Sequence, residues 1–358
     1  MKRFLIIIVV LGLFICMIGD AFAAKKYEGQ TMQAYLGLQP KHDELVMKYI
    51  APKLEEKYGI KLAVEMAGSN ITLEKLILMK DKPLVTIADI DSAVAVQAND
   101  LDLLAAIDLQ KVPNIKDLYD WTIIKDEEGI KILPTKITAI GLLYNEDEFK
   151  RNNWDPPTSW EDLWREELSG WVTITAPEST YGLGLLVALA RWGGGGEDNI
   201  QPGIDKIKSL LPHIHTIHTW SSELIKLFQL NEVVLGTTGS SIAYTMVEDG
   251  FPVKWIAPKE ICPVQLGGGI SIVKNAPFQD VAHDFINFYF STEFQLIMTR
   301  ESGSVSTNKN VWKELSETEK EKLPFTPEDF GKFIMLDWTK INENKNEWTE
   351  QFHKETLR

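Results

Sequence analysis

The chain alternates short apolar runs with longer segments in which apolar residues recur every three or four positions. The short runs are typical of strands, and the longer spacing is typical of amphipathic helices. The strand pattern occupies residues 31–38, 60–68 and 83–90, and each run is followed by the helix pattern, at 41–59, 70–81 and 92–101. This order predicts an α/β protein with a parallel sheet covered by helices on both faces. In such sheets a ligand binds beyond the carboxyl ends of the strands.

The middle of the chain repeats this order after an apolar strand that runs through Ile137 to Leu143. Strand, turn and helix recur at 171–192, 213–230 and 232–250, and a further strand follows at 253–258. After a run of three glycines the pattern predicts another strand, one long amphipathic helix at 279–300, and a polar C-terminal helix anchored by Trp338 and Trp348. The repetition predicts a second α/β lobe.

The N-terminus departs from this pattern. Lys2 and Arg3 precede an apolar run at 4–18, and Ala21-Phe22-Ala23 follows, which is the order of a secretory signal peptide cleaved near Ala23. The run is shorter than the roughly 20 residues that a spanning helix needs, which disfavours a retained anchor. Lipoprotein anchoring through Cys16 is disfavoured because Ile15 stands where a small residue is expected. We therefore expect a periplasmic or secreted protein whose only remaining thiol is Cys262.

The net charge of the chain disfavours nucleic acid as a binding partner. The 358 residues include 37 Lys and Arg against 51 Asp and Glu, a formal net charge of −14, which repels nucleic acid. No nucleophile elbow, phosphate-binding loop or dinucleotide fingerprint is present, so catalysis is disfavoured. One alternative remains, a secreted metal-handling protein or enzyme that uses His213 and His215. On a strand these two would share a face and His218 would point to the other.

The order and spacing of several motifs resemble the type II periplasmic solute-binding proteins of ABC importers, the branch with polyamine, ferric-iron, thiamine and phosphorylated-solute binders. The motifs are "EEKYGIKLAVE", "AIGLLYNEDEF", "PTSWEDLWREELSGWVTI", "NEVVLGTTGSS", "FPVKWIAPKE", "GGGISIVKNAP" and "AHDFINFYFSTEFQ". The resemblance implies two α/β lobes joined by a hinge, with a small-molecule solute between them and the transmembrane subunits of an ABC permease as partner. We place lobe 1 at 28–138 and 268–312, and lobe 2 at 139–267 and 313–358. We expect a monomer without a cofactor.

Candidate ligand-binding residues are those in the turns that follow the strands, together with Lys136 just before the chain first crosses between lobes. In lobe 1 they are Gln39, Ser69, Asn70, Asp89, Asp91 and Ser92. In lobe 2 they are Ser179, Thr180, Tyr181, Trp220, Ser221, Ser222, Gly239, Ser240 and Ser241. Each could instead serve only to cap a helix.

The content of these turns bears on the ligand class. Polyamine binders of this group carry aromatic and acidic residues where this chain has Gly239 and Gly268, and iron binders carry paired tyrosines where it has Ser240 and Ser241. Hydroxyl groups at helix N-termini favour an anionic phosphate or carboxylate. Arginine is scarce in these turns, so a neutral polar solute stays open, as does a polyamine or thiamine-type cation.

Overall fold

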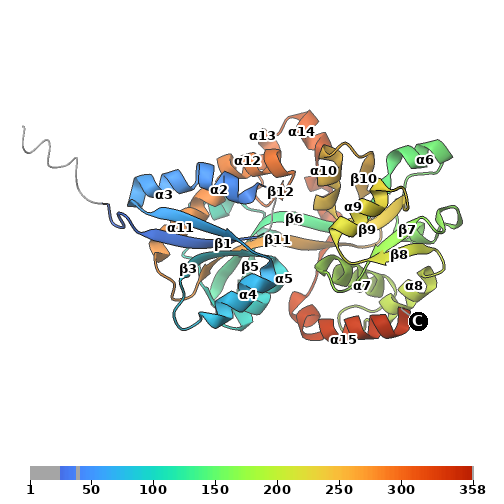
Figure 1. Cartoon of the computed structure of the whole chain (residues 1–358), viewed down its shortest axis with the longest axis horizontal. Coiled ribbons are helices and arrows are strands. Elements are labelled where there is room, and N and C mark those ends of the chain that lie inside the picture. The colour runs from blue at the N-terminus through green and yellow to red at the C-terminus, as the bar shows by residue number, and fades with distance from the viewer. Residues whose placement is uncertain (1–24, 38–40, 357–358) are drawn as a thin grey trace, which may run out of the picture.

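The computed structural model describes residues 25–37 and 41–356. The expected signal peptide, Cys16 and Gln39 lie outside these residues. Within them the chain forms two α/β lobes side by side, joined through one continuous sheet of order β2-β1-β3-β11-β6-β9-β7-β8 (Figure 1). No helix in the described ranges is both long and apolar enough to cross a membrane.

The first lobe is built on three parallel strands. They are β1 (Thr31–Leu36), β2 (Lys61–Met66) and β3 (Val85–Ile90). The helices are α2 (His42–Tyr49), α3 (Ala51–Tyr58), α4 (Ser69–Leu78), α5 (Ser92–Asp100), α11 (Gln279–Tyr289) and α12 (Thr292–Ser302). Two apolar clusters fill this lobe, one of them centred on Phe285, Tyr289 and Phe290. Short elements complete it: β4 (Leu104–Ala105), β5 (Ile124–Asp126), and the 3-10 helices η2 (Pro113–Asp117) and η3 (Asp120–Thr122).

Two expected single helices are each divided in the structure. The helix expected at 41–59 breaks at Ile50, because Pro52 has no N–H to donate back to the preceding turn and instead sits in the first turn of α3. The helix expected at 279–300 breaks at Ser291, whose extended backbone and side chain cap α12 through a 3.3 Å bond from the Phe294 N–H. Both expectations of one continuous helix were wrong.

Two long antiparallel strands connect the lobes, β6 (Gly129–Asn145) and β11 (Cys262–Val273). β6 pairs with β11 over Leu133–Ala139 and then with β9 over Ile140–Tyr144, so one strand belongs to both lobes. The sequence predicted only its apolar half. A third apolar cluster covers these crossing strands.

The second lobe has three parallel strands beside β6. They are β7 (Val172–Thr175), β8 (Ile214–His218) and β9 (Leu235–Gly239), with β10 (Val253–Ile256) antiparallel to β6. Its helices are α6 (Glu146–Asn152), α7 (Thr180–Trp192), α8 (Gln201–Leu210), α9 (Ser221–Gln229) and α10 (Ser240–Glu248). Ser159 caps the start of η4 (Trp160–Trp164), which is followed by η5 (Glu166–Leu168). The core of this lobe surrounds the apolar helix α7.

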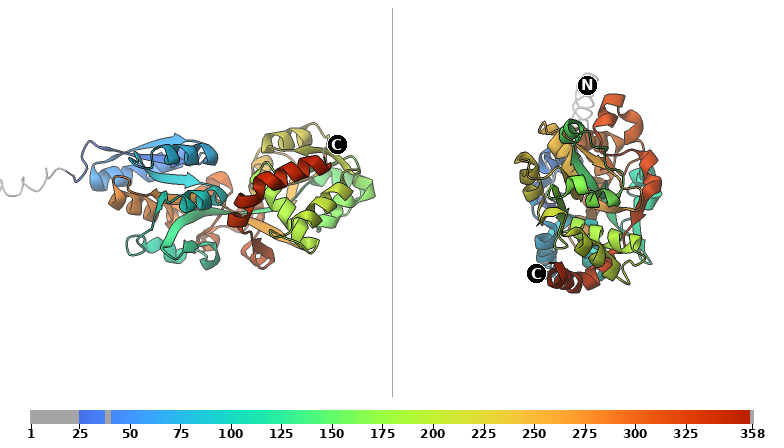
Figure 2. Two further views of the ribbon diagram at one scale, coloured as in Figure 1. Left: turned by 90° about the horizontal axis from the view of Figure 1, so that it is seen from below. Right: turned by 90° about the vertical axis from the view of Figure 1, so that its right-hand side faces the viewer.

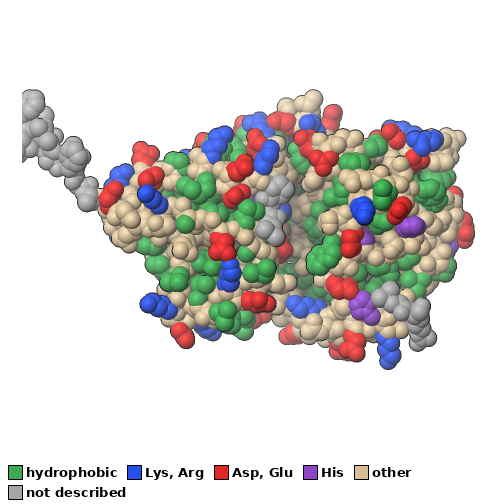
Figure 3. Space-filling view, viewed as in Figure 1, with side chains coloured by type: hydrophobic (Ala, Val, Ile, Leu, Met, Phe, Trp, Pro, Cys, Tyr) green, Lys and Arg blue, Asp and Glu red, His purple; other side chains and the backbone are tan. Residues whose placement is uncertain are grey.

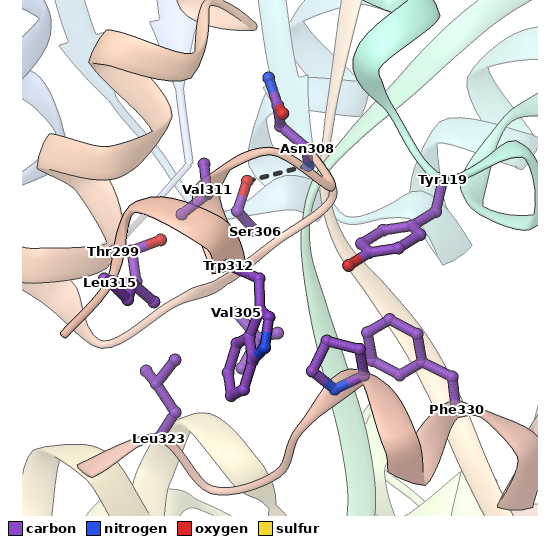
Figure 4. A pocket seen from close by; sticks show the side chains of 11 residues that line it. Tyr119, Thr299, Val305, Ser306, Asn308, Val311, Trp312, Leu315, Leu323 and Phe330 are labelled. Carbon is purple, nitrogen blue, oxygen red and sulfur yellow. Dashed lines mark hydrogen bonds between the residues drawn. The ribbon is translucent and has the colours of Figure 1, made fainter. Parts of the chain in front are cut away.

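The C-terminal segment runs along both lobes. After β12 (Val305–Ser306) come α13 (Val311–Glu314), α14 (Glu317–Lys322), η6 (Pro327–Lys332), β13 (Phe333–Met335) and α15 (Trp338–Thr356). Figure 2 shows the start of α15 between the lobes and its end on the second lobe. Tyr119, Trp312 and Phe330 enclose a pocket of only about 10 Å³ (Figure 4). That space holds about one water, so this segment closes tightly on the first lobe.

Candidate functional site

A polar cleft of about 310 Å³ lies between the two lobes, and the surface is visibly hollowed there (Figure 3). Residues of both lobes and of the crossing strands line it: Gly37, Gly68, Ser69, Asp89, Asp91, Lys136, Tyr181, Ser241, Ile242, Thr245, Gly268, Ser302 and Ser304. The lining is rich in hydroxyl groups and has charged groups of both signs.

Four helices begin at this cleft because the carboxyl ends of the parallel strands face it. Ser69 is the first residue of α4, Asp91 is the N-cap of α5, Tyr181 lies in the first turn of α7, and Ser241 lies in the first turn of α10. The first N–H groups of a helix have no partner within it, and the helix dipole places partial positive charge there. The cleft therefore gathers backbone donors from both lobes.

The cleft floor consists of Lys136, Asp89 and Asp91. Lys136 projects from β6 across Gly267, where a Cβ would lie 2.7 Å from the lysine Cε, so the glycine leaves room for the lysine side chain. Burial lowers the pKa of Lys136, while the charges of Asp91 and Asp89 oppose that shift. The two carboxylates thus help to keep the ammonium group charged.

Asp89 ends the buried strand β3 and its side chain has no exposed surface. Burial raises its pKa to about 7, against the opposing charge of Lys136. Behind it, His42 Nδ1 lies 3.4 Å from Asp89 Oδ2, and His42 Nε2 lies 2.8 Å from the hydroxyl of Tyr289. Burial lowers the pKa of His42 to about 3, so this imidazole is neutral at physiological pH.

Asp91 stands at the start of α5 without capping it, since its side chain accepts no hydrogen bond from the helix. Its backbone N–H donates to Ser69 Oγ over 3.0 Å, which ties the starts of α4 and α5 together. An aspartate at an N-cap ordinarily bonds to its own helix. Here its carboxylate faces the cleft instead.

The second lobe contributes a wall of hydroxyl groups. The Tyr181 hydroxyl lies 3.2 Å from Ser241 Oγ, and burial raises the pKa of this phenol to about 12, so it stays protonated. The Tyr181 ring lies so close to Gly239 that a side chain at 239 would collide with it. The space beside Gly239, where polyamine binders were expected to carry an aromatic, is thus filled by Tyr181.

The structure brings six of the expected residues together in the cleft: Ser69, Asp89, Asp91, Lys136, Tyr181 and Ser241. The other expected residues within the described ranges do not line it. Ser179 caps α7 through the Gly182 N–H, and buried Ser240 accepts a 3.2 Å bond from the Ala139 N–H. Trp220 is 61% exposed at the start of α9. The residues outside the cleft lining are Asn70, Ser92, Ser179, Thr180, Trp220, Ser221, Ser222, Gly239 and Ser240.

Several lining residues were not among those expected from the sequence: Gly37, Gly68, Ile242, Thr245, Gly268, Ser302 and Ser304. Gly268 could have been noticed in the sequence, because a glycine inside a strand often marks an irregular backbone or a close approach of another group. In the structure its φ is +60°. Ser302 is the last residue of α12 and Ser304 comes two positions later, with their hydroxyl oxygens 2.8 Å apart, so both lie at the end of a helix rather than of a strand. No rule about strand ends would have found them.

The alternative function was proposed for His213 and His215, with His218 expected on the opposite face of the strand. His218 is buried in the core, with its ring nitrogens 2.9 Å from Thr173 Oγ1 and 3.1 Å from Thr175 Oγ1. His215 is exposed and its Nε2 lies 3.7 Å from Glu232. Across residues 25–37 and 41–356, no three His, Cys, Asp or Glu side chains gather as a metal site would require.

Comparisons with known proteins agree with this geometry. A model of the family described as bacterial extracellular solute-binding protein matches residues 49–324. A search of curated protein sequences finds no significant match.

Three solved structures illustrate the likeness in fold. An ABC transporter protein from Clostridium perfringens is 20% identical, with a TM-score of 0.76 over 90% of this chain and 99% of that one. The spermidine/putrescine substrate-binding protein PotD from Streptococcus pneumoniae is 21% identical, with a TM-score of 0.75 over 90% and 99%. The periplasmic binding protein AfuA from Actinobacillus pleuropneumoniae, with fructose-6-phosphate bound, is 21% identical, with a TM-score of 0.67 over 92% and 99%. These likenesses confirm the expected type II periplasmic-binding-protein fold.

Proposed function

Because the chain belongs to the family of bacterial extracellular solute-binding proteins, whose members bind rather than transform their ligands, we propose that it is the substrate-binding component of an ABC importer. It captures a small polar solute between its lobes, the lobes close around the solute, and a membrane permease receives it. The proposal includes export with cleavage near Ala23, a monomeric state, and the lobe boundaries at 138/139, 267/268 and 312/313.

The solute we propose carries an anionic group, a phosphate or a carboxylate. The observation that carries this proposal is the convergence of Lys136 with the helix starts of α4, α5, α7 and α10 in one cleft. A micromolar site needs about 8 kcal/mol. One charge-assisted hydrogen bond gives about 1.5–3 kcal/mol and one helix dipole about 0.3–1 kcal/mol, so such a site needs several of these groups acting together.

A cationic solute is the second candidate, and the two carboxylates of the cleft floor favour it. Asp91 leaves its helix uncapped and faces the cleft, where it could accept hydrogen bonds from an ammonium group. Lys136 opposes this candidate, because its positive charge occupies the same floor.

A thermal-shift panel separates the two candidates. The panel contains fructose-6-phosphate, a phosphonate, a dicarboxylate, thiamine and spermidine, each added to the purified protein. We expect stabilisation by a phosphate, phosphonate or carboxylate compound. Stabilisation by spermidine or thiamine alone would replace the anionic proposal with the cationic one, and native mass spectrometry of the purified protein would identify any solute that it retains.

A further inference from the structure

The C-terminal helix α15 makes a specific polar contact with the first lobe. Asn342 Nδ2 donates to the Ala93 carbonyl over 2.7 Å, and Gln97 Nε2 donates to Asn342 Oδ1 over 3.1 Å. Both groups of one amide are therefore satisfied by α5. Asn342 is partly buried, which shields these two hydrogen bonds from water.

The rest of α15 is fixed to the second lobe. Ile341, Trp348 and Phe352 are buried in the core that surrounds α7. Ion pairs join Lys208 to Glu355 over 3.0 Å and Lys340 to Asp198 over 2.7 Å. Since these contacts hold α15 along most of its length, the helix moves with the second lobe.

The helix that Asn342 contacts leads directly into the cleft. α5 follows β3, and its N-cap is Asp91, two residues before Ala93. Ala93 and Val96 also pack against the core of the second lobe, so α5 rests on that lobe through apolar contacts as well. Any rotation about β6 and β11 must change this junction, because its two sides belong to different lobes.

We propose that the Asn342 contact with α5 is a latch between the lobes, which stabilises their present relative orientation and so helps to set the balance between open and closed forms. It lies outside the cleft lining and acts on solute affinity only by shifting that balance. This consequence for affinity rests on the proposed function, whereas the latch itself can be tested without any solute.

The test measures the distance between lobes in the solute-free protein. Spin labels are attached through Leu78→Cys on α4 and Lys226→Cys on α9, both exposed positions, in a background with Cys16→Ser and Cys262→Ala. Pulsed electron paramagnetic resonance then gives the distance distribution. We expect Asn342→Ala to change the population ratio of the lobe orientations by about 5- to 10-fold, as the loss of two modest hydrogen bonds predicts.

Asn344→Ala is the matched control, because its amide donates only within α15, to the Lys340 carbonyl over 2.8 Å. It should leave the distance distribution unchanged. Gln97→Leu removes one of the two latch bonds from the other lobe and should shift the distribution in the same direction as Asn342→Ala. If both Asn342→Ala and Gln97→Leu give the wild-type distribution, the latch is overturned, whatever solute the cleft binds.

Discussion

The hydroxyl of Tyr181 lies 3.2 Å from Ser241 Oγ, so the first turns of α7 and α10 share one hydrogen-bonding pair at the cleft wall. The neighbouring Ser240 points the other way, is buried, and accepts a hydrogen bond from the Ala139 N–H of β6. Two adjacent serines that look equivalent in sequence thus face different surroundings.

This difference predicts that alanine substitution of Ser241 mainly weakens solute binding, whereas alanine substitution of Ser240 mainly lowers stability. Ser241→Ala should weaken binding of the solute identified in the panel by about 5- to 10-fold, because it removes one hydroxyl from the cleft. It should lower stability less than Ser240→Ala, because the Tyr181 hydroxyl that loses its partner faces the cleft. Ser240→Ala should lower stability by about 1–2 kcal/mol, because the buried Ala139 N–H loses its partner. Titration calorimetry and chemical denaturation measure the two effects. Equal losses of affinity in both variants would contradict the separation.

Replacing the cleft lysine tests the sign of the solute. Lys136→Met keeps the side-chain length that Gly267 accommodates but removes the charge. We expect affinity for an anionic solute to fall at least tenfold, since a charge-assisted hydrogen bond contributes about 1.5–3 kcal/mol. Isothermal titration with the best anion from the panel provides the measurement. Unchanged affinity would mean that the lysine only balances Asp89 and Asp91.

Asp91→Asn tests the sign of the solute's charge by removing a carboxylate from the cleft floor. If the solute is anionic, removing this negative charge should leave affinity unchanged or raise it, because a repulsive charge is lost. If the solute is cationic, affinity should fall by tenfold or more. Because the Asp91 side chain does not cap α5, the melting temperature should stay close to that of the wild type.

The pH dependence of stability should reveal Asp89 and His42 as opposing groups. Because the pKa of Asp89 is raised to about 7, its carboxyl group keeps a proton in the folded state that it loses in the unfolded state. The contribution of Asp89 to the free energy of unfolding therefore falls as pH rises from about 4 to 7. Because the pKa of His42 is lowered to about 3, its ring is neutral in the folded state at pH values where the unfolded state still holds a proton. The contribution of His42 to the free energy of unfolding therefore rises with pH from about 3 to 6.5. In the wild type the two contributions partly cancel between pH 4 and 6.5.

Asp89→Asn removes the titrating carboxyl group and leaves the titration of His42 in place. The stability of the variant relative to the wild type should rise as pH increases from 4 to 7, by up to about 1.4 kcal/mol for each unit by which the Asp89 pKa is displaced. Melting temperatures across this range test the expectation. A constant difference between variant and wild type would show that Asp89 titrates normally.

Gly303 provides a test of the contact between the lobes beside the cleft. It ends α12 with a φ of +64°, and a Cβ there would collide with the ring of Tyr244 on α10. Gly29 has a φ of +75° with open space around it, so Gly29→Ala measures the backbone strain alone, about 1–2 kcal/mol. Gly303→Ala should cost more in chemical denaturation. In a Tyr244→Ala background, which has its own packing cost, Gly303→Ala should cost only about as much as Gly29→Ala. Equal costs for the two glycines would exclude the collision.

Much of the secondary structure followed from local patterns. The period of the apolar residues located β1 to β3, α4, α5 and the three strand-helix repeats of the second lobe, because burial on a sheet face or a helix stripe has a fixed spacing along the chain. The helix breaks at Ile50 and Ser291 were missed, since the apolar periodicity continues across both. The full length of β6 was missed as well, because Lys136 and Pro134 interrupt its apolar run.

The sequence by itself determined the class of fold, the family, and the hydroxyl-rich character of the strand-end turns. Only the tertiary structure decided which of those hydroxyls face the cleft, because Ser240 and Ser241 differ in the direction of one side chain and not in chemistry. It also brought Ser302 and Ser304, which are far from Ser241 in the sequence, to the same cleft, and it placed Asn342 against α5. Such contacts depend on how the two lobes pack around β6 and β11, and no local pattern along the chain records that packing.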